Sequence, residues 1–108
     1  MGSLTEVTDA TFEQEVLSSE LPVLVDFWSA GCGPCLRLAP VLEELAGDNA
    51  GKLKIVKANV EQTMGTAGQY GVSMLPTLVI IKGGEVVERI IGAKAKSDLQ
   101  AAIDAAIA

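Results

Sequence analysis

One stretch of this sequence reads VLVDFWSAGCGPC over residues 23–35, and it predicts both a fold class and the place of the reactive side chains. Its first six residues are apolar on both faces except at Asp26. This pattern is typical of a strand inside a sheet that is covered on both sides, because a surface strand alternates apolar and polar residues. The only two cysteines, Cys32 and Cys35, follow directly. A buried central strand therefore leads into a cysteine pair.

Helices are predicted on both sides of this strand, where apolar residues recur at intervals of three or four. Thr8 is expected to cap a first short helix, and Ser97 with Gln100 forms a capping-box pattern that opens the last one. Pro40 lies inside the helix predicted after Cys35 and should kink it, because proline removes a backbone donor. The apolar positions of these helices are Phe12, Val16, Leu17, Leu38, Val41, Leu42, Leu45, Leu99, Ile103 and Ile107.

Further strands are predicted from runs rich in β-branched and apolar residues. These runs span residues 53–58, 77–82 and 85–91. Gly83-Gly84 joins the last two, and such a pair is a strong signal for a two-residue hairpin, so these strands should be antiparallel. A weaker helix is predicted over residues 61–69, where two glycines lower the propensity. Alternating strands and helices that end in a hairpin indicate an α/β fold with a mixed sheet.

The composition limits the classes of protein to which the chain can belong. With 108 residues, 49% of them hydrophobic, we expect a single domain over residues 1–108 that buries a core without metals or disulfides. The net charge of −6 argues against a nucleic-acid surface. The longest nearly apolar run, residues 21–28, is too short to cross a membrane. No signal peptide is evident, so we expect a cytoplasmic protein, or a plastid stromal one if a transit peptide has been removed.

Three kinds of site could use a Cys-x-x-Cys pair. A structural disulfide would close only a four-residue ring, for which the chain-entropy estimate is roughly 2 kcal/mol, less than for longer loops. A structural zinc ion needs four ligands, whereas this chain has two cysteines and no histidine, so carboxylates or a second chain would have to complete it. The lack of histidine also excludes Ser-His-Asp and Cys-His hydrolases. The pattern favours thiol–disulfide exchange, since side chains three apart in a helical turn can approach disulfide distance with small adjustments.

Several short motifs follow one another along the chain in an order that is typical of one family. They are Val25-Asp26-Phe27-Trp28, Cys32-Gly33-Pro34-Cys35, Ala39-Pro40, Gln69-Tyr70-Gly71-Val72, Leu75-Pro76-Thr77-Leu78, Lys82-Gly83-Gly84-Glu85 and Gly92. Through these motifs the sequence resembles the thioredoxin family over nearly its whole length, and most of all the bacterial and plastid m-type thioredoxins. The resemblance implies a thioredoxin fold, with a central mixed sheet of about five strands, about four flanking helices, and a C-terminal hairpin followed by a helix. Two positions depart from the family pattern: Gly31 stands where a tryptophan is usual, and Asn59 where an aspartate is common.

Roles for the reactive residues follow from their positions and from the resemblance. Cys32 is expected at a helix N-terminus, where free N–H groups and the helix dipole favour the thiolate, and it would be the nucleophile. Cys35 would be the resolving thiol. Burial should raise the pKa of Asp26, which the resemblance makes the general acid/base. The alternative for Asp26 is a structural ion pair with Lys57 alone.

The remaining candidate residues shape the site or bind the substrate. Gly33 and Pro34 would tune the redox potential, and Pro40 would be a structural kink. Pro76 resembles the family's cis proline opposite the cysteines. The residue before it would offer its backbone to an extended substrate segment. The candidate substrate-binding residues are Trp28, Gly31, Val72, Ser73, Met74, Leu75, Pro76 and Gly92.

The resemblance implies a monomeric thiol-disulfide oxidoreductase that reduces protein disulfides through a reversible Cys32–Cys35 disulfide and holds no bound cofactor. Its partners would be disulfide-containing target proteins and a thioredoxin reductase linked to NADPH or to ferredoxin. Gly31 would weaken contacts with the usual reductase or with particular targets. Two alternatives remain open: a redox-inactive interaction module that keeps the fold, and an oxidant or isomerase, which Gly33-Pro34 disfavours.

Overall fold

The sheet at the centre of the molecule is mixed and has five strands in the order β1-β3-β2-β4-β5. The computed structural model describes residues 4–108. Strands β1, β3 and β2 run parallel, whereas β4 is antiparallel to β2 and β5 is antiparallel to β4. The predicted mixed α/β sheet is therefore confirmed. The strands span Thr5–Glu6 (β1), Val23–Trp28 (β2), Lys54–Asn59 (β3), Thr77–Lys82 (β4) and Glu85–Ile91 (β5).

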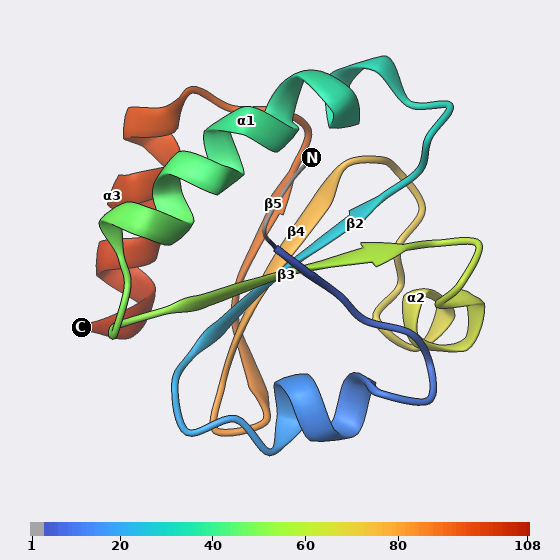
Figure 1. The fold of residues 1–108 in the computed structure, drawn as a ribbon, viewed down its shortest axis with the longest axis horizontal. Coiled ribbons are helices and arrows are strands. Elements are labelled where there is room, and N and C mark those ends of the chain that lie inside the picture. The colour runs from blue at the N-terminus through green and yellow to red at the C-terminus, as the bar shows by residue number, and fades with distance from the viewer. Residues whose placement is uncertain (1–3) are drawn as a thin grey trace.

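Helices cover both faces of this sheet (Figure 1). Successive residues of a strand point to opposite faces, which explains why β2 is apolar on both. Leu24 packs in a cluster with buried leucines of α1 and α3, whereas Val23, Val25 and Phe27 pack in a second cluster with residues of η1 and α2. Asp26 shares the face of Leu24, beneath α1 and α3. The helices span Glu13–Leu17 (η1), Gly33–Asp48 (α1), Met64–Gln69 (α2) and Lys96–Ile107 (α3).

Two predicted helix caps are wrong. Thr8 lies before η1, in a turn where its backbone N–H donates to the Oγ1 atom of Thr11 at 2.9 Å, and the cap position of the helix is Phe12. Ser97 lies inside α3, because the amide of Leu99 already donates to the carbonyl oxygen of Ala95 at 3.1 Å. Residue type alone therefore placed both starts wrongly.

The C-terminal hairpin forms as predicted. Gly83 and Gly84 have φ angles of 60° and 82°, which L-residues with a Cβ rarely adopt. Positive φ at both central residues is what a tight turn matching the strand twist requires. The hairpin places the end of β5 beside the start of β4, with Ile91 opposite Thr77.

The short strand β1 is not foreseen in the sequence. It contains only Thr5 and Glu6 and pairs with β3 at one edge of the sheet. Glu6 lies opposite Lys57, and Lys57 lies opposite Asp26 on the next strand. Since paired residues share a face of a sheet, three ionisable side chains form a row across three strands. This row lies on the face of the sheet that α1 and α3 cover.

Candidate active site

The sheet topology brings four chain segments together at one end of the strands, which we call the reactive end of the sheet. The C-terminal ends of the parallel strands β2 and β3 lie at this end, and so does the start of the antiparallel β4. The backbone N–H of Val60, after β3, donates to the carbonyl oxygen of Trp28 at 2.9 Å, and the N–H of Gly92, after β5, donates to that of Pro76 at 2.8 Å. Because Cys32 follows β2 and Pro76 precedes β4, the topology brings the cysteine turn and Pro76 to this same end of the sheet.

Cys32 and Cys35 form a disulfide, with their Cα atoms 5.2 Å apart. Cys32 is the N-cap of α1, and its Sγ atom accepts a hydrogen bond of 3.1 Å from the backbone N–H of Cys35. A helix N-terminus of this kind favours a negatively charged sulfur. Cys32 is half-buried, whereas Cys35 is only 2% exposed. The two sulfurs therefore differ in environment, with Cys32 the more accessible.

The residues around the pair leave it open to a partner. Gly33 and Pro34 form the first turn of α1 and are both exposed; a proline is tolerated there because the first turn lacks hydrogen-bond acceptors for its N–H groups. Gly31 is exposed, and no atom lies within 4 Å of where its Cβ would be. Pro40 lies inside α1, as predicted, and is exposed. Gly31 thus forms the rim of the site, by which we mean the exposed surface next to Cys32, and this rim is unobstructed.

Asp26 is a buried carboxyl group in the middle of the sheet. It is 1% exposed, and its Oδ1 atom has no hydrogen-bond partner among residues 4–108. Burial raises its pKa from 3.8 to about 7; the charge of Lys57 opposes this shift, and the charge of Glu6 adds to it. The expected upward shift is confirmed. A carboxyl group in this state can take up or release a proton near neutral pH.

The alternative for Asp26, a structural ion pair with Lys57 alone, is not found among residues 4–108. The ammonium Nζ of Lys57 lies 3.8 Å from Glu6 Oε2 and 4.3 Å from the centre of the Trp28 ring. Within residues 4–108 the ion pair of Lys57 is with Glu6, and Asp26 has none. Because β1 carries no signal in the sequence, Glu6 could not be recognised there as the ion-pair partner of Lys57. The indole Nε1 of Trp28 is itself buried without a hydrogen-bond partner in the same residues.

The peptide bond between Leu75 and Pro76 is cis, as the resemblance implies. The Thr77 hydroxyl donates to the carbonyl oxygen of Met74 across this segment, at 2.5 Å. Gly92 has a φ of 90°, a value that favours glycine, while its N–H holds the Pro76 carbonyl. The segment is thus anchored through Met74, Pro76 and Gly92.

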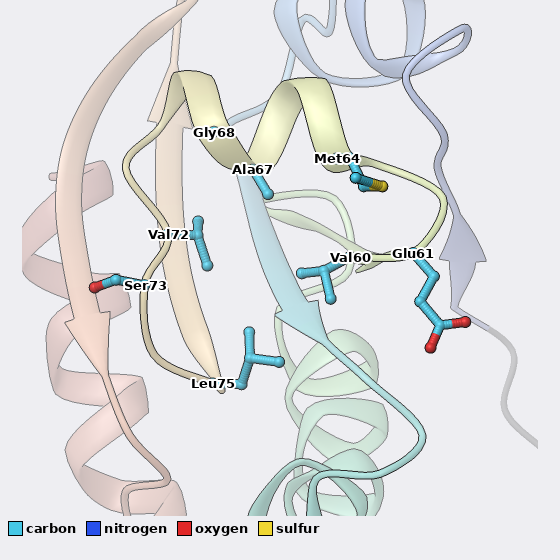
Figure 2. Close-up of a pocket in the computed structure, with 8 residues that line it drawn as sticks. All are labelled: Val60, Glu61, Met64, Ala67, Gly68, Val72, Ser73 and Leu75. Carbon is cyan, nitrogen blue, oxygen red and sulfur yellow. The ribbon is translucent and has the colours of Figure 1, made fainter.

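A groove of about 510 Å³ lies between α2 and the segment before β4. Figure 2 shows Val60, Val72 and Leu75 around one space beneath Ala67. Three of the predicted substrate-binding residues line it: Val72, Ser73 and Leu75. The others, Trp28, Gly31, Met74, Pro76 and Gly92, are not among its lining residues. The lining residues that sequence reasoning missed are Val60, Glu61, Met64, Ala67 and Gly68.

The described residues 4–108 contain no group of three or more cysteine, aspartate or glutamate side chains placed to hold a metal ion. Both cysteines are taken up by the disulfide, so they do not act as zinc ligands in this state. Over the same residues, no helix combines the length and apolar character needed to cross a bilayer.

The sequence model of the thioredoxin family matches residues 3–105. The chain belongs to the thioredoxin family. It is 50% identical over 103 residues to thioredoxin 2 of Chlorobaculum tepidum, covering 95% of this chain and 94% of that protein. Identity is 47% over 104 residues with thioredoxin 1 of Nostoc sp. (96% and 97% covered) and 53% over 98 residues with thioredoxin of Streptomyces clavuligerus (91% of each). Together with the Cys32–Cys35 disulfide, this makes the chain a thiol-disulfide oxidoreductase of the thioredoxin type, a protein-disulfide reductase.

Proposed function

We propose that residues 1–108 form one thioredoxin domain in which Cys32 is the nucleophile and Cys35 the resolving thiol. The observation that carries this assignment is the difference between the two cysteines: Cys32 is half-buried and its Sγ atom accepts a hydrogen bond from the Cys35 N–H, while Cys35 is buried. In the reduced protein, the Cys32 thiolate attacks one sulfur of a target disulfide and expels the other as a thiolate. Cys35 then attacks Cys32 Sγ in the mixed disulfide and releases the second target sulfur.

Asp26 handles the proton of the second step. Cys35 must lose a proton before it attacks, and a carboxylate with a pKa of about 7 can accept it, directly or through water. Two electrons pass from the dithiol to the target, and the two thiolates of the target take up protons from solvent. The unpartnered Oδ1 atom of Asp26 supports this role, because it leaves an acceptor site free.

The groove receives an extended segment of the target next to its disulfide. Its lining is mainly apolar, and the backbone of Leu75 at its edge can pair with an extended strand. Glu61 is the one charged side chain of the lining. Trp28, Gly31, Met74, Pro76 and Gly92 flank the cysteine turn and complete the docking surface, with Gly33 and Pro34 tuning the redox potential.

The electron donor is a thioredoxin reductase, linked either to NADPH or to ferredoxin, and the targets are proteins that carry accessible disulfides. The protein works as a monomer without a bound cofactor, in the cytoplasm or in a plastid stroma. The open rim at Gly31 supports a choice of partners that differs from that of relatives with a tryptophan there.

Reduction of insulin by dithiothreitol tests the assigned roles. Cys35→Ser should abolish catalytic turnover. When the variant is reduced, freed of dithiothreitol and mixed with insulin, it should accumulate a mixed disulfide between Cys32 and the target, because no second thiol is present to resolve it. Cys32→Ser should abolish turnover without accumulating one, and it is the matched control. Accumulation of the mixed disulfide in Cys32→Ser, but not in Cys35→Ser, would reverse the roles. Turnover that survives both substitutions would refute the mechanism.

A further inference from the structure

The position of the Lys57 side chain cannot be explained by Asp26. Lys57 lies opposite Asp26 in the register of β2 and β3, and a buried carboxylate would normally attract an ammonium group. Instead, its Nζ atom lies 3.8 Å from Glu6 Oε2 and 4.3 Å from the centre of the Trp28 ring. Asp26 Oδ1 remains without a hydrogen-bond partner in the described residues.

Glu6 comes from the edge strand β1, on the far side of Lys57 from Asp26. Its side chain is 47% exposed, whereas that of Lys57 is 20% exposed. An exposed ion pair alone contributes little to stability. Here the ammonium also lies within the distance at which an aromatic face attracts a cation, so two contacts draw it away from the buried carboxyl.

We propose that Glu6 is a positioning residue for the exchange reaction: with the Trp28 ring, it holds the Lys57 ammonium so that no ion pair forms with Asp26. This proposal rests on the proposed role of Asp26 in proton transfer. Glu6 is not one of the residues that line the groove, and it is not part of the disulfide. It acts through Lys57 and, more weakly, through its own negative charge.

The charges that act on Asp26 are those of Lys57 and Glu6, which lie in one row with it across β3 and β1. On the other side of Asp26, β4 presents Leu78. The helices that cover this face turn apolar side chains and one disulfide sulfur inward; their buried residues are Cys35, Leu38, Leu42, Leu45, Leu99 and Ile103.

The test is Glu6→Gln, which removes the charge and keeps the size of the side chain. Asp26 should then lose its proton more readily, since Lys57 is free to approach and a nearby negative charge is gone. Two strand spacings, about 10 Å, separate Glu6 from Asp26, and the charge alone should lower the Asp26 pKa by about 0.3 to 1 pH unit. Glu85→Gln removes the same charge from the opposite edge strand and should leave the Asp26 pKa unchanged.

The pKa is measured by ¹³C NMR titration of the Asp26 carboxyl in the disulfide form, in which neither cysteine titrates. The titration is repeated in a Lys57→Met background, where the effect of Glu6→Gln should shrink if Glu6 acts mainly by holding the ammonium. An equal shift in both backgrounds would refute the holding mechanism. An unchanged pKa in Glu6→Gln would refute the whole proposal.

The pH profile of insulin reduction separates this proposal from the role of Asp26. If both stand, the midpoint of the profile moves to lower pH in Glu6→Gln by the same amount as the Asp26 pKa. If the pKa moves and the profile does not, Glu6 still positions Lys57, and Asp26 is not the proton-transfer group.

Discussion

Replacing Asp26 with asparagine should stabilise the fold, and by an amount that depends on pH. The carboxyl has an ordinary pKa of 3.8 when the chain is unfolded and a pKa of about 7 when it is buried. Below pH 3.8 it is protonated in both states, so burial carries no charge penalty. As the pH rises toward 7, only the unfolded chain releases the proton freely, and folded stability is lost. Above pH 7 the full penalty applies, and the two pKa values place it at about 4 kcal/mol.

Asparagine has nearly the same shape and cannot ionise, so Asp26→Asn removes this penalty. The variant and the parent should have similar free energies of unfolding near pH 4, and at pH 8 the variant should be more stable by about 4 kcal/mol. Urea denaturation followed by far-UV circular dichroism at both pH values measures the difference. Asp98→Asn, in the exposed first turn of α3, is the matched control and should change stability by less than about 1 kcal/mol at either pH. A difference for Asp26→Asn that is equal at pH 4 and pH 8 would show that folding does not raise the pKa of this carboxyl.

Two further substitutions test the rim and a helix start. Gly31→Trp meets no atom within 4 Å of the new Cβ, so the free energy of unfolding should change by less than about 0.5 kcal/mol while the KM for insulin falls; a change confined to stability would contradict a role in docking. Asp9 accepts hydrogen bonds from the Gly65 N–H and from the N–H and hydroxyl of Thr66, which hold its pKa below the ordinary range. Asp9→Asn should therefore lower the melting temperature at pH 7, by an amount that shrinks as acid protonates the parent carboxyl; an equal loss at pH 7 and pH 3 would contradict this.

The interior strands could be predicted because their pattern reflects burial that the sequence itself encodes. β2 and β4 are buried on both faces and are apolar at nearly every position, while Gly83-Gly84 identifies the exposed β5. β1 could not be found, because Thr5–Glu6 is short, exposed and defined only by its pairing with β3. The predicted helix starts are wrong for a related reason. Several residues near each start could cap the helix, and tertiary packing determines which of them does.

Some residues of the site can also be recognised in the sequence, and others cannot. The cysteine pair, Asp26 and Pro76 can be recognised, because each is a reactive or rigid residue that interrupts an apolar stretch. Apolar groove residues such as Val60 carry no such signal, since they become a surface only when α2 and the segment before β4 come together. The alternative ion pair between Lys57 and Asp26 does not form, because the fold supplies a second carboxyl, Glu6, from a strand that the sequence does not predict.

The position of Trp28 determines what optical experiments on this protein can report. It is the only tryptophan, and it lies at the end of β2 with an ammonium group over its ring. Its fluorescence therefore reports on the reactive end of the sheet, while circular dichroism reports on helices and strands throughout. The unfolding transitions seen by fluorescence and by circular dichroism coincide only if that end unfolds together with the rest of the molecule. A fluorescence change on oxidation, denaturation or target binding is thus a local signal from an intrinsic probe beside the cysteine turn.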